Sequence, residues 1–197
     1  MLARSAKLTK DDVVLEIGTG MGSLTGLFAE EAAQVITVEI DEYLYQMASE
    51  ELEIFDNIEM LKQDALIAAI KRHMAVDPQR VFKLAANLPY NVATPIISNL
   101  LRAEIVPATM TVTIQKELAD RLVASPGSKD YGALSVWVQA ICDTEIVRVM
   151  SPKVFWPRPK VDSAIIHIVH RPELRSQIPD LGFFHAFVRA MFFHRRK

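Results

Sequence analysis

Residues 87–90 place an amide, a proline and an aromatic ring side by side at the end of an apolar run. The side-chain oxygen of Asn87 and the carbonyl of Leu88 can each accept one N–H from an aromatic amine such as that of adenine. Pro89 would fix the carbonyl through its restricted φ, and Tyr90 would stack on the base. An ordinary turn is the alternative interpretation, because Asn and Pro are common turn residues.

Two hydrogen bonds to one amine would favour the methylation of that amine. The nitrogen lone pair of adenine's amine is delocalised into the ring, so the nitrogen is a poor nucleophile. Two acceptors favour a pyramidal nitrogen, and their bonds strengthen as positive charge develops on it, which stabilises the transition state preferentially. Holding the nitrogen in line with a methyl donor would be the main contribution. This chemistry requires neither a metal nor a strong general base.

A glycine-rich segment that follows the first predicted strand indicates where such a donor would bind. Gly18, Gly20 and Gly22 permit a tight turn and a close approach to a ligand, and a predicted helix then presents free N–H groups. Ligands of open parallel sheets bind at the carboxyl ends of the strands. The dinucleotide fingerprint requires a third glycine at position 23, which is Ser23 here.

Two acidic residues follow the next two predicted strands. Glu39 ends the second strand, where an acid can accept hydrogen bonds from both hydroxyls of a ribose. Asp64 follows the third strand, where the edge of an adenine would lie. With the glycines, these acids indicate an adenosine-bearing ligand, and the absence of a Gly-Lys-Ser/Thr P-loop favours S-adenosylmethionine (SAM). The alternatives are NAD, glycines that only shape a turn, and acids that only begin a helix.

Strands and helices alternate at short intervals through the first two thirds of the chain. This alternation predicts an α/β fold with a central, mostly parallel sheet and helices on both faces. The predicted strands are residues 13–17, 34–38, 58–61, 81–86 and 110–114, and the predicted helices are residues 23–33, 42–53, 65–74, 95–101 and 116–123. After residue 124 we expect a helix at 134–141, antiparallel strands at 145–150 and 164–170, and a last helix at 183–194.

The proline-rich segment between the last two strands offers a second aromatic surface. Phe155 and Trp156 lie between prolines and are flanked by the cations Lys153, Arg158 and Lys160. An aromatic side chain can stack on an unpaired or extruded base while the cations contact phosphates. The alternative is a hydrophobic anchor within an irregular loop.

Composition narrows the class of protein. The 197 residues suit one domain, half of them are hydrophobic, and no apolar run reaches the length that spans a bilayer. The only cysteine, Cys142, excludes an internal disulfide and a thiolate zinc cluster, so we expect a buried thiol in a cytoplasmic protein. The formal charge is −7 over residues 1–100 and +5 over residues 101–197, a weak indication of nucleic acid at one end.

The order of these motifs resembles that of the ribosomal RNA adenine dimethyltransferases. The shared segments are EIGTGMGSLT, VEID, QDAL, NLPYNVATPII, QKELADRL, YGALSVWVQ and VFWPRPKVDSAII, and the chain is most similar to the KsgA type. The resemblance implies a Rossmann-like, SAM-dependent enzyme that methylates each of two adjacent adenines twice, near the 3′ end of small-subunit rRNA. It further implies a role in ribosome biogenesis, with the immature small subunit as partner of a monomeric protein.

The same resemblance assigns roles to particular positions. It implies a cofactor site formed by Glu16, Gly18, Gly20, Glu39, Asp64 and Asn87. It implies that residues 87–90 bind the amine and that Phe155 stacks on the base. Family members also carry an upstream segment with a Gln-x-Phe-Leu-like motif and continue into a small helical domain. We therefore interpret residues 1–197 as a catalytic-domain fragment.

Three other functions fit parts of the pattern. An Erm-type enzyme would methylate large-subunit rRNA, although YGALSVWVQ and RAMFFHRRK favour the KsgA type. A non-catalytic assembly or transcription factor would not need the intact glycine segment or residues 87–90. Glutamine methylation of a protein usually goes with Asn-Pro-Pro-Tyr, and Leu88 speaks against it.

Overall fold

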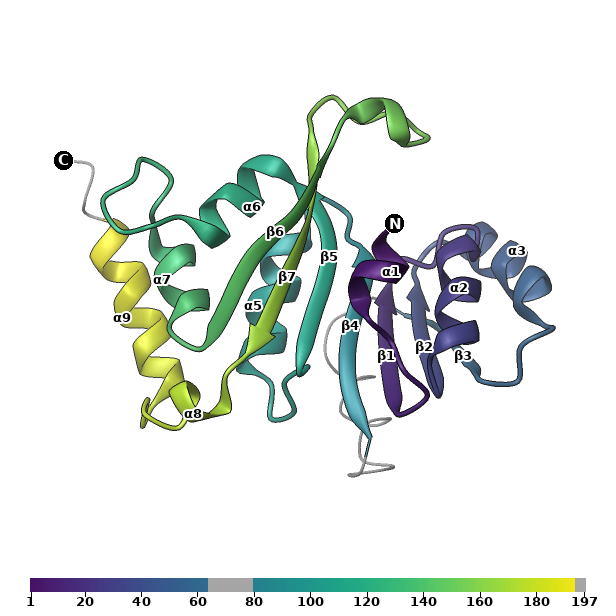
Figure 1. The fold of residues 1–197 in the computed structure, drawn as a ribbon, viewed down its shortest axis with the longest axis horizontal. Coiled ribbons are helices and arrows are strands. Elements are labelled where there is room, and N and C mark those ends of the chain that lie inside the picture. The colour runs from purple at the N-terminus through teal and green to yellow at the C-terminus, as the bar shows by residue number, and fades with distance from the viewer. Residues whose placement is uncertain (64–79, 194–197) are drawn as a thin grey trace. The chain divides into compact units, whose positions relative to one another are not determined.

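The computed structural model describes residues 1–63 and 80–193 (Figure 1). The chain divides into two compact units, Met1–Thr113 (unit 1) and Ile114–Lys197 (unit 2), which are described separately below. Asp64, the helix predicted at 65–74 and His194 lie outside the described residues. No helix in the described ranges is long and apolar enough to cross a membrane.

Unit 1 contains a parallel sheet, as the alternation of strands and helices predicts. Its strands are β1 (Asp12–Ile17), β2 (Gln34–Glu39), β3 (Ile58–Lys62), β4 (Val81–Asn87) and β5 (Thr109–Gln115). They are ordered β3-β2-β1-β4-β5, and every neighbouring pair is parallel. The central strands are near-continuous apolar runs because both faces of a parallel sheet are covered. Val14, Leu84 and Val112 are at most 1% exposed.

Four helices are described in unit 1. They are α1 (Leu2–Ala6), α2 (Ser23–Glu31), α3 (Glu42–Leu52) and α5 (Ala93–Arg102), and three of them, all except α1, begin and end close to predicted positions. The N-cap of α3 is Asp41, whose carboxylate accepts a hydrogen bond from the Leu44 N–H at 2.9 Å. Helix α5 begins two residues before the predicted start, which places Pro95 within its first turn.

The strand order reverses direction between β1 and β4. From β1 the chain moves outward through β2 to β3, and from β4 it moves the other way to β5. Right-handed connections then put α2 and α3 on one face of the sheet and α5 on the other. At such a reversal a crevice opens beyond the carboxyl ends of the strands, and ligands of open α/β sheets bind there.

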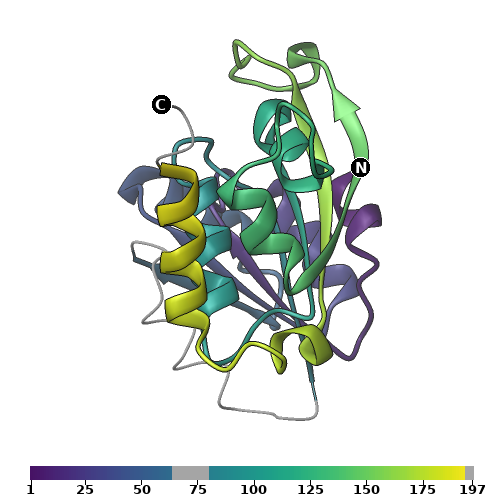
Figure 2. The same ribbon diagram turned by 90° about the vertical axis from the view of Figure 1, so that its left-hand side faces the viewer.

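Unit 2 is built around an antiparallel pair of strands and the helices that pack on it. Its elements are α6 (Lys116–Val123), α7 (Ala133–Gln139), β6 (Cys142–Met150), η2 (Pro152–Val154), β7 (Ser163–His170), α8 (Pro172–Arg175) and α9 (Leu181–Phe193). The antiparallel pairing of β6 with β7 confirms the predicted arrangement. Figure 2 shows α9 alongside α7, and there Trp137 contacts the His185 ring with centroids 4.6 Å apart.

Cys142 lies in the core of unit 2, as its apolar surroundings predict. It is 2% exposed. Burial, with a smaller contribution from the neighbouring Asp143, raises the pKa of its thiol to about 12. The thiolate is the reactive form of cysteine, so this side chain is an inert part of the core.

Candidate functional site

The glycine segment after β1 adopts a backbone conformation that side chains disfavour. Gly18, Gly20 and Gly22 all have positive φ, at 85°, 57° and 80°. The Gly18 N–H donates to the Val38 carbonyl at 2.8 Å, which ties the start of the loop to β2. Gly22 then forms the N-cap of α2. The predicted glycine loop is therefore present and leads directly into a helix N-terminus.

Glu39 holds this loop in place from the end of β2. Its Oε2 accepts the Gly20 N–H at 2.9 Å, and its Oε1 accepts the N–H groups of Ile40 and Asp41 at 2.9 and 3.0 Å. The side chain is 7% exposed. A carboxylate offers about four acceptor positions. Three are occupied by backbone amides, which leaves about one for a ligand hydroxyl.

Glu16 lies beneath the loop rather than on its surface. It is 1% exposed, and its Oε2 accepts the hydroxyl groups of Thr25 at 2.6 Å and Thr37 at 2.8 Å. The Thr19 and Thr37 hydroxyl oxygens are 2.6 Å apart. Because Thr37 has one hydroxyl hydrogen and donates it to Glu16, Thr19 is the donor to Thr37. This chain of hydroxyls connects the buried carboxyl to the glycine loop.

The Glu16 carboxyl is poorly solvated. Desolvation raises its pKa, and the hydrogen bonds from Thr25 and Thr37 lower it. The negative charge of Glu39 raises it further, and the result is a pKa of about 7. Glu16 does not line the cavity described below. The geometry therefore favours a supporting role, in which Glu16 positions the loop and the first turn of α2.

Residues 87–90 follow β4 on the other side of the crevice. Asn87 ends the strand and is exposed, whereas Leu88 is 2% exposed and its N–H donates to the Thr113 carbonyl at 3.1 Å. Among the described residues, neither the Asn87 side chain nor the Leu88 carbonyl has a hydrogen-bond partner. Both acceptors that the sequence singled out are thus available. The turn interpretation also holds for the backbone, because the Val92 N–H donates to the Pro89 carbonyl at 3.1 Å.

The glycine loop and residues 87–90 come together in unit 1. A Cβ atom built on Gly18 would lie 3.9 Å from the Asn87 carbonyl oxygen and 3.9 Å from the Pro89 Cδ. The two segments are 69 residues apart in sequence, and the parallel pairing of β1 with β4 joins them. The sequence-based prediction that both lie at one edge of the sheet is therefore correct.

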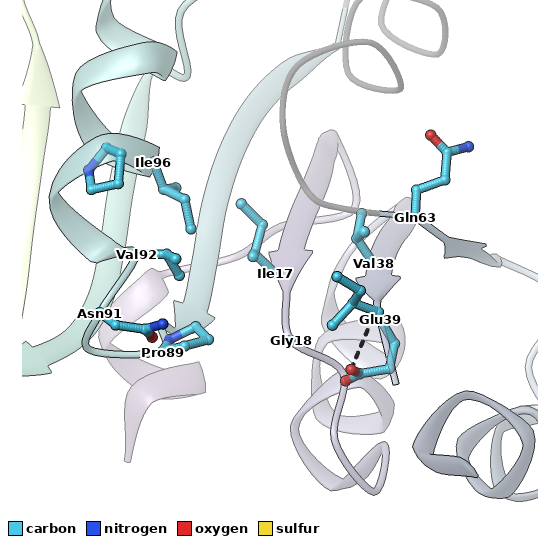
Figure 3. Close-up of a pocket in the computed structure, with 11 residues that line it drawn as sticks. Ile17, Gly18, Val38, Glu39, Gln63, Pro89, Asn91, Val92 and Ile96 are labelled. Atoms are coloured by element: carbon cyan, nitrogen blue, oxygen red, sulfur yellow. Dashed lines mark hydrogen bonds between the residues drawn. The ribbon is translucent and has the colours of Figure 1, made fainter. Parts of the chain in front are cut away.

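A cavity of about 320 Å³ opens at this edge (Figure 3). Its walls come from the ends of β1 and β2, from the residue after β3, and from the connection between β4 and α5. The lining residues are Ile17, Gly18, Val38, Glu39, Ile40, Gln63, Pro89, Asn91, Val92, Pro95 and Ile96. Most of this surface is apolar, with polar groups at a few positions, which is typical of small-molecule sites.

The lining overlaps the predicted site only in part. Gly18, Glu39 and Pro89 belong to both sets, whereas Asn87 and Tyr90 do not line the cavity. Sequence reasoning did not identify Gln63, although its place directly after β3 was a usable signal. Phe155 belongs to unit 2, where it is half-buried at the C-cap of η2.

The residues present fit an adenosine-bearing ligand. The apolar walls suit a purine ring, Glu39 offers a carboxylate to a ribose, and the loop glycines let a ligand approach the backbone closely. Ile40 is 68% exposed beside Glu39, so an apolar surface is open to a flat ring at this point. The chemistry of these groups agrees with SAM as the bound cofactor.

The fold and the site define a Rossmann-like, SAM-dependent methyltransferase. The particular family follows from comparison with known proteins. The chain belongs to the ribosomal RNA adenine dimethylase family, whose sequence profile matches residues 2–197.

Curated relatives agree with this assignment. The chain is 40% identical over 196 residues to the ribosomal RNA small subunit methyltransferase A of Clostridium acetobutylicum. The matched region covers 100% of this chain and 70% of that protein. It is also 40% identical over 198 residues to the protein of the same name from Lachnoclostridium phytofermentans, covering 68% of that protein.

Solved structures show the same fold. A dimethyladenosine transferase from Plasmodium falciparum superposes with a TM-score of 0.85 at 28% identity, over 100% of this chain and 68% of that chain. The 23S rRNA methyltransferase ErmE superposes with a TM-score of 0.79 at 30% identity, over 99% of this chain and 76% of that chain.

Proposed function

We propose that this protein transfers methyl groups from SAM to the exocyclic amines of two adjacent adenines in small-subunit rRNA. It would act as a monomer, in the cytoplasm, on the immature small subunit during ribosome biogenesis. The observation that carries the proposal is the approach of Gly18 to Asn87 and Pro89 beside the cavity. This approach would bring the proposed nucleoside-binding loop next to two available acceptors for an amine.

The glycine loop and Glu39 would hold the cofactor. When bound, SAM supplies an electrophilic methyl group. Gly18 and Gly20 allow the backbone to lie against the ligand, and Glu39 would accept a hydrogen bond from a ribose hydroxyl. Glu16 would act indirectly: its hydrogen bonds with Thr25 of α2 and Thr37 of β2 would hold the loop and the first turn of α2 in position.

The segment after β4 would hold the amine. The Asn87 oxygen and the Leu88 carbonyl accept one N–H each, Pro89 restrains the carbonyl, and Tyr90 stacks on the base. An amide and a carbonyl are not bases at neutral pH, so the proton that the amine loses passes to water. By resemblance to the family, we propose that Phe155 also stacks on the base.

Methyl transfer to purified ribosomal subunits tests this function. Small subunits from cells that lack the enzyme should accept label from methyl-labelled SAM, and primer extension should then stop at two adjacent adenines. Fully modified small subunits serve as the control, because both of their target adenines already carry the methyl groups. Label that appears only in large subunits would contradict the proposal.

The second candidate is methylation of large-subunit rRNA, and the superposition with ErmE favours it. The curated relatives at about 40% identity, however, are small-subunit enzymes. Giving both subunits in one competition assay separates the candidates, since each predicts label in a different rRNA.

A further inference from the structure

Trp156 is the most exposed large hydrophobic side chain among the described residues. It lies in the hairpin tip, residues 151–162, which connects β6 to β7 and projects beyond the strands in Figure 1. Its side chain is 95% exposed, whereas the other tryptophan, Trp137, is 2% exposed. Tryptophan is highly buried on average in folded proteins, so full exposure of this ring requires an explanation.

The tip does not use Trp156 to stabilise itself. Trp156 is exposed, whereas its neighbour Phe155 is half-buried. Among the described residues, Trp156 makes no ring contact with another aromatic side chain. Three prolines restrict the backbone around it, at positions 152, 157 and 159, so the ring is presented on a stiff segment.

Three cations surround this ring in the sequence of the tip. Lys153, Arg158 and Lys160 are all exposed, and within the described part of the chain none of their side chains forms an ion pair. The one acid of the tip is Asp162, which lies close enough to Lys116 to influence it electrostatically. The tip therefore carries positive charge that the protein itself does not neutralise.

From this combination we propose that the hairpin tip is a docking site for single-stranded RNA. Trp156 stacks on one unpaired base, and the three cations contact the phosphates on either side of it. An aromatic ring flanked by cations is the usual composition of such sites, because every base has a π-face and every linkage a negative charge. The contact is separate from the role of Phe155 on the target adenine. It rests on the proposed function only for its choice of RNA as the polyanion.

Intrinsic fluorescence isolates this contact, because the chain has two tryptophans and one of them is buried. The full chain is titrated with a short, unstructured oligoribonucleotide without SAM. Emission of the wild type should change on binding, whereas that of Trp156→Phe, which reports only Trp137, should stay constant. Wild-type emission that the oligonucleotide leaves unchanged would overturn the inference.

Affinity measurements separate stacking from charge. Trp156→Ala should bind the oligonucleotide roughly 5- to 150-fold more weakly, the cost of losing one stacked base, with an unchanged salt dependence. Replacing the three cations by alanine should instead reduce the slope of log K against log salt by roughly 0.7 per residue. Tyr43→Ala is the matched control, since Tyr43 is 69% exposed but lies beside Asp41 and Glu42. Equal losses in Tyr43→Ala and Trp156→Ala would overturn the assignment.

Methyl transfer measured on the same preparations distinguishes this inference from the proposed function. A wild type that methylates small subunits, with Trp156→Ala binding RNA normally, would overturn the docking site alone. A wild type whose Trp156 reports RNA binding but which transfers no methyl group would contradict the function alone. A loss in Trp156→Ala for intact subunits but not for the oligonucleotide would overturn RNA stacking and point to a ribosomal protein as the partner.

Discussion

The two units of the molecule handle charged and polar groups in opposite ways. Unit 1 carries 9 Lys and Arg against 16 Asp and Glu, and unit 2 carries 13 against 8. Unit 1 buries several of its polar side chains at the ends of parallel strands, as Glu16 and Glu39 show. Unit 2 keeps Trp156 and the tip cations Lys153, Arg158 and Lys160 exposed. An acidic unit with a preorganised pocket suits a small cofactor, whereas a basic unit with exposed rings suits a polyanion.

The largest expected effect is on turnover and lies in unit 1. Asn87→Ala should lower kcat roughly 100- to 1,000-fold, the loss found when one hydrogen bond to developing charge is removed. SAM affinity and the fold should change much less, so single-turnover methylation and cofactor titration measure the two effects separately. Asn99→Ala is the control, because Asn99 is the same residue type on the following helix, α5, and does not line the cavity. Equal losses in both variants would remove the argument from amine activation.

The next effect is on stability and depends on pH. The folded-state pKa of Glu16 is raised to about 7, so its contribution is present at low pH and is lost as pH rises from about 4.5 through 7. The free energy of unfolding of the wild type, relative to Glu16→Gln, should therefore fall by roughly 2–3 kcal/mol between pH 5 and pH 8. Urea denaturation at the two pH values measures it.

An exposed carboxylate on the adjoining helix provides the control for this titration. Glu31→Gln, at the end of α2, should follow the wild-type pH dependence. If Glu16→Gln also follows the wild-type pH dependence, the buried carboxyl of Glu16 does not have the raised pKa that its surroundings require.

A smaller effect concerns cofactor affinity. Glu39→Ala should weaken SAM binding by about 1.5–3 kcal/mol, the range for hydrogen bonds to a charged group. Part of the loss would come from the loop, because Glu39 also accepts the N–H groups of Gly20, Ile40 and Asp41. Calorimetry measures the affinity, with Glu42→Ala as control, since Glu42 is exposed and pairs with Lys62. An unchanged affinity in Glu39→Ala would refute the ribose role.

The fold was predictable where burial leaves a strong pattern. Strands β1, β2 and β4 contain buried apolar runs, and the predicted ends of β1 to β5 are within about one residue of those observed. The short elements α1, η2 and α8 were not predicted, because three to five residues are too few to show a helical period. Strand β6 begins at Cys142, three residues before the predicted start, and Cys142, Asp143 and Thr144 carry no regular alternation.

The site was predictable where a residue type follows a strand. The position of Gly18, Glu39 and Asn87 at one edge of the sheet could be predicted in this way, because the carboxyl ends of parallel strands meet there. Their roles toward a ligand stay predictions. The walls formed by Val92, the N-cap of α5, and by Ile96, within α5, could not be predicted, since ordinary apolar residues acquire this role only through the fold. The supports of Glu16 could not either: Thr25 and Thr37 are 9 and 21 residues away, and a threonine has no distinctive sequence signal.

The smallest effect is expected for the surface ion pairs of unit 2. Arg121 donates to Glu117 at 2.6 Å one helical turn away, and the two side chains are 53% and 73% exposed. Glu117→Gln should change the free energy of unfolding by no more than about 0.5 kcal/mol, because water and salt screen such pairs. Urea denaturation at low and high salt measures it. A loss well above 1 kcal/mol would mean that the charges of unit 2 hold its fold together, and the contrast with the buried carboxyl of unit 1 would then fail.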